Sequence, residues 1–183
     1  MSIINKIILY PSLIYGAAME YCGMRTWYTR IDEHCILGAL PMERNYKQII
    51  AKENIKAVLT LNEDHELYYS IPKSEWLNNG VNYLQVPIKD YVGVANLEQI
   101  KESVEFIKMH KEKNECVYVH CKAGRYRSAL IVACYLIDSK DMRPEQAASF
   151  LIALRPHVIL NIKRQVNAMN NYYDYVKKNK NKY

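Results

Sequence analysis

The stretch CVYVHCKAGRYRSALIVACYLI, residues 116–137, constrains the fold more than any other part of the chain. It opens with an apolar run of strand length and composition, Cys116 to Val119. It closes with a run rich in Ala, Leu and Ile, Ala129 to Ile137, which predicts a buried helix. The turn between them points backbone N–H groups and the positive end of the helix at one spot, which is a typical phosphate site. We therefore predict a strand, a phosphate-binding loop and a helix in succession.

Cys121 lies in this loop with the neighbours that a nucleophile needs. A free cysteine has a pKa near 8.5, so only about 3% is thiolate at pH 7. Lys122, Arg125 and Arg127 stand close by in the sequence. A pKa lower by about three units, equivalent to roughly 4 kcal/mol, would leave the sulfur mostly ionised. Arg127 can grip two phosphate oxygens with its planar fork, and the Ser128 hydroxyl can donate to the sulfur. The alternative interpretation is a buried structural cysteine in a basic surface turn.

Composition narrows the class of protein. The 183 residues favour one domain with a sizeable core. The cysteines are odd in number and form no CxxC pair or Cys/His ligand spacing, which argues against disulfides or a zinc site and for a reducing compartment; they are Cys22, Cys35, Cys116, Cys121 and Cys134. The net charge of +6 is modest, and no basic and aromatic stripe recurs, so we expect no nucleic-acid partner.

The two ends of the chain leave alternatives open. Ile7 to Ala18 is apolar, but it is too short for a membrane span and Pro11 interrupts it. A membrane-leaning or organelle-directed segment over residues 1–25 and a short helix packed on the domain both fit this pattern. We assign residues 26–178 to a catalytic domain and 179–183 to a basic tail. Such a tail is typical of a solvated helix end, and contact with an anionic lipid surface is the alternative.

Strands and helices alternate along the rest of the chain. We expect strands at 35–37, 55–61, 82–86 and 116–119, and helices at 43–53, 72–78, 97–113, 129–137, 144–154 and 163–178. In the long helix, Ile100, Val104 and Ile107 should face inward. This order predicts an α/β domain with a central, mostly parallel sheet of four to five strands and helices on both faces. The loops at 62–66, 89–94 and 121–127 follow strands, so they should gather around one mouth.

If Cys121 displaces a phosphoryl group from an alkoxide or phenoxide, the departing oxygen needs a proton donor. Asp90 is the best candidate, because its loop follows the strand that ends at Val86, and this strand should pair beside the central strand. A solvated surface Asp is the alternative, and Asp64 is the reserve candidate. His120 is next to Cys121 but projects to the other side of the strand, so we expect it to orient the loop.

Several segments carry a family resemblance. VYVHCKAGRYRS at 117–128, with its Cys-x5-Arg-Ser spacing, resembles the catalytic loop of cysteine-dependent protein tyrosine and dual-specificity phosphatases. WYTRID at 27–32, ILGALP at 36–41 and VLTLNEDHE at 58–66 resemble one branch of that family, the mitochondrial enzymes that dephosphorylate phosphatidylglycerophosphate on the cardiolipin pathway. The resemblance covers most of the chain.

The resemblance implies a dual-specificity phosphatase-like fold and a two-step reaction without metal or other cofactor. Cys121 would attack phosphorus while Asp90 protonates the leaving alcohol, and water would then release the phosphate. The residues that would hold the phosphate are Arg127, Ser128, Lys122, Ala123, Gly124, Arg125 and Tyr126. The extra cations Lys122 and Arg125 would favour a lipid with a second phosphate. A protein phosphatase and a phosphate-binding pseudophosphatase are the alternatives.

The same resemblance implies an anionic phospholipid substrate and a mitochondrial, intracellular protein in peripheral contact with the inner membrane; we expect a monomer. Three departures from the family pattern stand out. Tyr126 replaces a small hydroxyl residue and could narrow or re-aim the pocket. Tyr91 and Val92 follow Asp90 where Thr is common. Gln165 lies near the position of a family Gln at a looser spacing, so we assign it no role.

Overall fold

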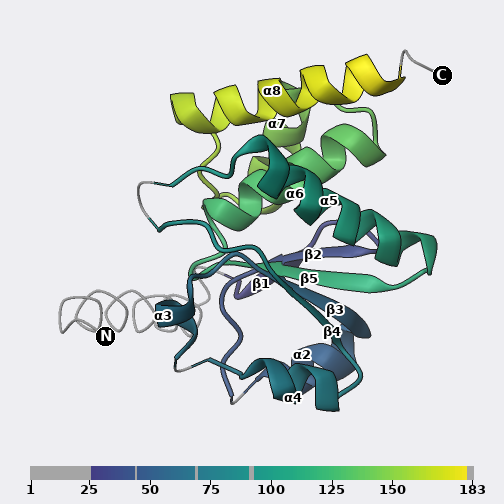
Figure 1. Cartoon of the computed structure of the whole chain (residues 1–183), viewed down its shortest axis with the longest axis vertical. Coiled ribbons are helices and arrows are strands. Elements are labelled where there is room, and N and C mark those ends of the chain that lie inside the picture. The colour runs from purple at the N-terminus through teal and green to yellow at the C-terminus, as the bar shows by residue number, and fades with distance from the viewer. Residues whose placement is uncertain (1–25, 44, 69, 91–92, 181–183) are drawn as a thin grey trace.

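The computed structural model of the chain, drawn in Figure 1, describes residues 26–180 except 44, 69 and 91–92. Its centre is a five-stranded sheet in the order β1-β2-β5-β3-β4. The strands are β1 (Tyr28–Arg30), β2 (Cys35–Gly38), β3 (Ile55–Thr60), β4 (Asn82–Gln85) and β5 (Cys116–His120). β1 is antiparallel to β2, and the three other pairings are parallel. The predicted α/β architecture is confirmed.

The described residues form seven helices: α2 (Tyr46–Glu53), α3 (Asp64–Leu67), α4 (Lys73–Asn78), α5 (Leu97–Glu112), α6 (Arg127–Ser139), α7 (Pro144–Leu154) and α8 (Lys163–Lys180). α5 to α8 lie on one face, and α2 and α4 on the other (Figure 1). Side chains of the strands alternate between the two layers, as a pleated strand requires. Leu59 and Val119 join the core under α5 to α8, whereas Val58 and Tyr118 join the core over α2 and α4.

Several boundaries depart from the sequence predictions. α2 begins at Tyr46, not at residue 43, because Met42 and Asn45 are joined by a turn in which the Asn45 side chain accepts from the Met42 N–H at 3.0 Å. The predicted loop 62–66 contains the first residues of α3, which starts in a capping box made by Glu63 and Glu66. α8 continues to Lys180.

α5 and α6 show how strongly the apolar pattern determines burial. Ile100, Val104 and Ile107 of α5 are buried, as predicted. Every residue from Ala129 to Ile137 in α6 is buried, which explains why this run shows no polar face. β5 lies between β2 and β3, and α6 packs against α5, α7 and α8. The loop that joins β5 to α6 is therefore anchored at both ends in the core.

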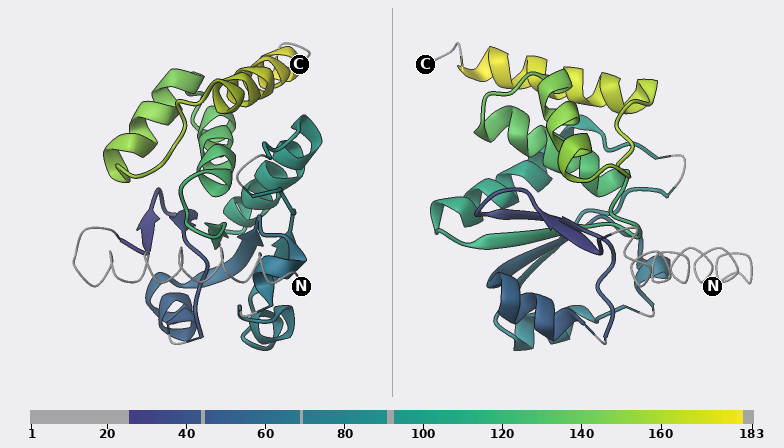
Figure 2. Two further views of the ribbon diagram at one scale, coloured as in Figure 1. Left: turned by 90° about the vertical axis from the view of Figure 1, so that its left-hand side faces the viewer. Right: turned by 180° about the vertical axis from the view of Figure 1, so that it is seen from behind.

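The carboxyl ends of the parallel strands lie at the edge of the sheet that faces the viewer in the left view of Figure 2. α3 follows β3 there, and α6 begins there after β5. The N-terminal segment 1–25 lies outside the described residues, as do Tyr91 and Val92. Within residues 26–180, as far as the structure describes them, no helix has the length and apolar character to cross a bilayer.

Candidate active site

The loop after β5 is held against the end of β2 by close backbone packing. Gly124 has a φ of +63°, and a Cβ at this position would lie 2.5 Å from the carbonyl carbon and oxygen of Gly38. The Leu40 N–H donates to the Lys122 carbonyl at 3.2 Å, which ties the loop to the chain beyond β2. Only glycine tolerates both the positive φ and this approach, so the loop conformation is set by the sequence at position 124.

Cys121 differs from the other cysteines that the structure describes. Burial would raise the pKa of Cys121, but the charge of Arg127 and hydrogen bonds from Ser128 and from the Arg125 N–H outweigh it and lower the pKa. The Ser128 hydroxyl lies 3.2 Å from the sulfur. Burial instead raises the pKa of Cys35, Cys116 and Cys134. The arrangement around Cys121 therefore favours a thiolate, which is the reactive form of the residue.

Arg127 joins the loop to the two neighbouring strand ends. Its guanidinium forms a bidentate pair with Glu66, with Nη1 and Nη2 at 2.7 and 2.8 Å from the carboxylate oxygens. Nη1 also donates to the carbonyls of Leu61 and Ile88, and Nη2 lies 3.0 Å from Asp90. The predicted gathering of the three loops around one mouth is borne out by these contacts.

Glu66 is a site residue that the sequence reasoning did not single out. It is 3% exposed on α3, and burial would raise its pKa, but Arg127 lowers the pKa below the ordinary value. Asp64, the reserve acid, is exposed and instead accepts from the Gln85 amide at 2.8 Å. The sequence signal that could have identified Glu66 is its place three residues after the N-cap residue Glu63. A Glu at this position of a capping box is held near the start of the helix.

Asp90 reaches the mouth, as expected, but the expected pairing of the preceding strand with the central strand is wrong, because β4 pairs with β3 and β3 lies between β4 and β5. Its carboxylate lies between Arg127 and Lys122, 3.6 Å from the Lys122 ammonium. Its own N–H donates weakly to Glu63 at 3.4 Å, which connects the 89–94 loop to α3. A phosphate dianion would bind the same two cations, so substrate would compete with Asp90 for them. This location suits an acid that meets the leaving oxygen.

His120 is fully enclosed behind the loop. Burial lowers its pKa to about 3, so the ring is neutral at physiological pH. It packs against Tyr118 with ring centroids 5.8 Å apart. A neutral ring in this place is in keeping with an orienting role and does not suit a proton donor at neutral pH.

Comparison with known proteins identifies the family. Residues 37–181 match the family model described as "Dual specificity phosphatase, catalytic domain". The chain belongs to the dual-specificity phosphatase family. It is 38% identical to the rat phosphatidylglycerophosphatase and protein-tyrosine phosphatase 1, over 84% of this chain and 81% of that protein.

Two further relatives place this phosphatase in the phosphatidylglycerophosphatase branch. The Arabidopsis thaliana phosphatidylglycerophosphate phosphatase PTPMT1 is 35% identical over 92% of this chain and 49% of its own length. The crystal structure of PTPMT1 in complex with PI(5)P superposes with a TM-score of 0.80 at 32% identity, covering 84% of this chain and 99% of that one. The chain is therefore a phosphatase of the cysteine-dependent kind, as the sequence predicted.

The remaining predicted ligands of the phosphatase lie along the loop. Ala123 is exposed, and Arg125 is half-buried with its Nε donating to the His157 carbonyl at 2.9 Å. Tyr126 has the Arg164 guanidinium over its ring at 5.6 Å. Gln165, to which we gave no role, is fully buried and its amide donates to the Tyr126 carbonyl at 3.4 Å. The segment 155–165 thus supports the outer side of the loop.

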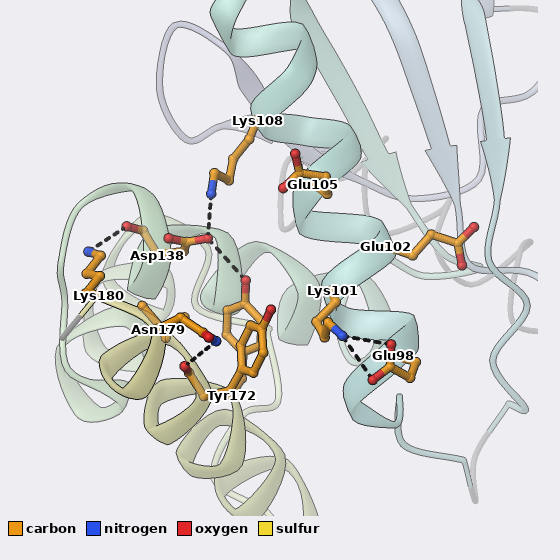
Figure 3. A pocket seen from close by; sticks show the side chains of 11 residues that line it. Glu98, Lys101, Glu102, Glu105, Lys108, Asp138, Tyr172, Asn179 and Lys180 are labelled. Carbon is orange, nitrogen blue, oxygen red and sulfur yellow. Dashed lines mark hydrogen bonds and ion pairs between the residues drawn. The ribbon is translucent and has the colours of Figure 1, made fainter. Parts of the chain in front are cut away.

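A groove of about 810 Å³ lies elsewhere on the phosphatase, between α5 and α8 (Figure 3). Lys108 pairs with Asp138 at 3.0 Å and Lys101 with Glu98 at 2.9 Å, so opposite charges of its walls neutralise one another. Asp138 stands at the far end of α6 from Arg127, about 16 Å along the helix. This groove takes no part in the site. Across the described part of the chain, no three or more His, Cys, Asp or Glu side chains are grouped to hold a metal ion.

Proposed function

We propose that this phosphatase hydrolyses phosphatidylglycerophosphate through a cysteinyl-phosphate at Cys121. One observation supports the proposal most: among the four cysteines that the structure describes, Cys121 alone has a lowered pKa. It is also the cysteine beside Ser128 and the Arg127 guanidinium. A thiolate held in a loop of amide donors next to a buried guanidinium is equipped for phosphoryl transfer.

The reaction follows from these positions in two steps. The Cys121 sulfur attacks phosphorus, the P–O bond to the alcohol breaks, and Asp90 gives its proton to the departing oxygen. Asp90 then takes a proton from water, which attacks phosphorus and breaks the S–P bond, so that inorganic phosphate leaves and the thiolate returns. Arg127 and the amides of residues 122–127 would hold the equatorial oxygens in both steps. Ser128 would donate to the sulfur as it leaves.

A lipid substrate is supported by two observations. Lys122 and Arg125 add two cations to the loop beyond Arg127, and they suit a headgroup that carries a second phosphate. The name of the rat relative begins with phosphatidylglycerophosphatase, and the plant relative is named a phosphatidylglycerophosphate phosphatase.

For the organisation of the chain, we propose residues 26–178 as the catalytic domain, 1–25 as a membrane-leaning segment and 179–183 as a basic tail. We also propose peripheral contact with the mitochondrial inner membrane and a monomeric state.

A protein substrate is the second candidate, because the rat relative's name also includes protein-tyrosine phosphatase. A pseudophosphatase is disfavoured, because Cys121, Arg127, Ser128 and Asp90 are all present and the structure brings them together. Phosphate release from phosphatidylglycerophosphate vesicles and from phosphotyrosine and phosphothreonine peptides, measured on the full chain, separates the two substrates. We expect a preference for the lipid in kcat/KM; a strong preference for peptides would reject the lipid assignment.

A further inference from the structure

Arg155 is a buried cation outside the set of residues assigned to the reaction. It follows α7 and is 1% exposed, and it is among the largest fully buried side chains that the structure describes. A buried guanidinium is costly unless its donors are used, so the contacts that surround it call for explanation. Its backbone is fixed as well, because its N–H donates to the Leu151 carbonyl at 2.8 Å.

The Arg155 guanidinium connects two segments that are far apart in the sequence. Its Nε donates to the Gly124 carbonyl at 3.1 Å, on the phosphate-binding loop. Its Nη1 donates to the Thr26 carbonyl at 3.0 Å and to the Thr29 hydroxyl at 3.0 Å, and its Nη2 donates to the Trp27 carbonyl at 3.3 Å. The chain before and within β1 is thus attached to the outer side of the loop through this one side chain.

The carbonyl that Arg155 contacts belongs to a peptide unit that also faces Cys121. The Gly124 carbonyl and the Arg125 N–H are the two ends of one planar peptide group and point in opposite directions. The Arg125 N–H is one of the backbone donors to the Cys121 sulfur. Fixing the carbonyl toward Arg155 therefore fixes the N–H toward the sulfur. The positive φ of Gly124 provides the turn that this orientation needs.

We propose that Arg155 is a positioning residue for Cys121, which holds the Gly124–Arg125 peptide unit with its N–H aimed at the sulfur and polarises that unit with its charge. A cation on the carbonyl oxygen strengthens the N–H as a donor, since hydrogen bonds in a chain reinforce each other, by about 10–30% per bond. Arg155 acts from behind the loop and through the peptide group. This inference rests on the proposed function, because it assumes that the Cys121 thiolate is the reacting group.

The other charges near Cys121 act by different routes. Arg127 acts on the sulfur through its charge, while Glu66 and Asp90 are held by Arg127. Lys122 pairs with Asp90, and His120 behind the loop is neutral. The hydrogen bonds of the Arg155 guanidinium go to Gly124 and to residues 26, 27 and 29, not to these side chains, so its effect on the sulfur can be measured separately.

The test is the pH dependence of Cys121 alkylation by iodoacetamide in the full chain, followed by mass spectrometry of the peptide that contains Cys121. In Arg155→Met we expect the pKa of Cys121 to rise by about one unit. At a pH below both pKa values, kcat/KM should fall about tenfold with it. In Arg155→Lys, which keeps the charge but not the planar fork, we expect a pKa between those of the wild type and of the Met variant.

Arg30→Met is the matched control. Arg30 is also a guanidinium that donates to several acceptors around β1, including Glu53 at 2.7 Å and the Glu33 carbonyl at 3.1 Å. The hydrogen-bond partners of Arg30 lie on residues 32, 33, 53 and 116, outside the phosphate-binding loop, so its loss should lower stability without moving the pKa of Cys121. An Arg155→Met variant that is less stable but keeps the wild-type Cys121 pKa would show a purely structural role and overturn the proposal.

The remaining outcomes also decide the question. If Arg155→Met fails to fold, an unchanged Cys121 pKa in Arg155→Lys overturns the proposal and a raised one supports it. Alkylation requires no substrate, so it reads the role of Arg155 independently of which phosphate ester is hydrolysed. A wild-type chain that releases no phosphate from the lipid would reject the proposed function while leaving this readout intact.

Discussion

At the scale of single residues, one Arg127 guanidinium interacts with Glu66, Asp90 and the Cys121 sulfur. Burial opposes its charge, but Glu66, Cys121 and Asp90 raise the pKa of Arg127, so it stays charged. The pair with Glu66 is almost fully enclosed, at 2% and 3% exposure, so its worth lies in orientation more than in net attraction. Glu66 holds the guanidinium plane, which leaves Arg127 fixed beside the sulfur.

Replacing Glu66 with Gln should therefore weaken both the fold and the reaction. Gln keeps one acceptor for Arg127 but removes the buried negative charge, so we expect a loss of about 2–4 kcal/mol in the free energy of unfolding and a lower kcat. Urea denaturation and steady-state kinetics check this. Asp64→Asn on the same helix is the control and should change stability by less than about 0.5 kcal/mol. Equal stability of Glu66→Gln and wild type would contradict the orienting role.

Asp90→Asn tests the proton donor. We expect kcat to fall about a hundredfold or more with an alkyl phosphate, whose leaving oxygen needs a proton, and much less with p-nitrophenyl phosphate, whose leaving group is stable as an anion. The comparison of the two substrates is the measurement. If turnover of the alkyl phosphate is unaltered, another acid supplies the proton.

At the scale of elements, the site depends on how β5, its loop and α6 are pressed against the end of β2. Tyr118 of β5 donates to the Ala39 carbonyl at 2.8 Å, and a Cβ on Gly38 would overlap the Tyr118 ring. Gly124 also lies close to Gly38, since a Cβ on Gly124 would be 2.5 Å from the Gly38 carbonyl. Two glycines thus allow strand, loop and neighbouring strand end to meet at backbone distance.

Gly124→Ala and Gly80→Ala form a matched pair for this contact. Both glycines have positive φ, +63° and +69°, but a Cβ on Gly80 meets nothing within 4 Å. We expect Gly80→Ala to cost about 1 kcal/mol in stability and to keep full activity. Gly124→Ala should displace the loop and lose most of its kcat. Similar activity of the two variants, measured on the same substrate, would show that the contact with Gly38 does not set the loop.

Sequence predicted the local elements well and the long-range pairs poorly. The apolar run of residues 129–137, the asparagine cap at Asn96 and the proline at Pro144 each specify a helix through nearby residues alone, and the structure has these helices. β1 has three half-buried or exposed residues and no apolar alternation, so it is recognisable only from its pairing with β2. The roles of Glu66 and Arg155 depend on partners 61 and 31 residues away, which no local pattern encodes.

At the scale of the whole molecule, the buried polar groups behind the site make stability depend on pH. His120 has a folded pKa of about 3 against an ordinary value of 6.5. Between these values the unfolded chain binds a proton that the folded chain does not, so stability rises with pH and is lost as pH falls. The lowered pKa values of Cys121 and Glu66 act in the same direction.

We expect the His120 contribution to cost the wild type about 2 kcal/mol between pH 7 and pH 5. Urea denaturation at the two pH values measures the loss, and His120→Asn, which cannot titrate, should show a correspondingly smaller difference. A difference as large in His120→Asn as in the wild type would assign the acid sensitivity to other groups. The ion pairs between Asp141 and the end of α8 should not add to this loss between pH 7 and pH 5. Lys177 and Lys180 lower the pKa of the exposed Asp141 below its ordinary value, which is already below pH 5.

The central claim, that one sulfur accepts the phosphoryl group, has a direct test. Full-length wild type is mixed with phosphatidylglycerophosphate vesicles, quenched in acid within milliseconds, and the peptide that spans Cys121 is examined by mass spectrometry. We predict a phosphoryl adduct on Cys121 that forms before phosphate release and is missing in Cys121→Ser, which also releases no phosphate. Turnover by Cys121→Ser at the wild-type rate, or a phosphoryl adduct on a different residue, would contradict the account.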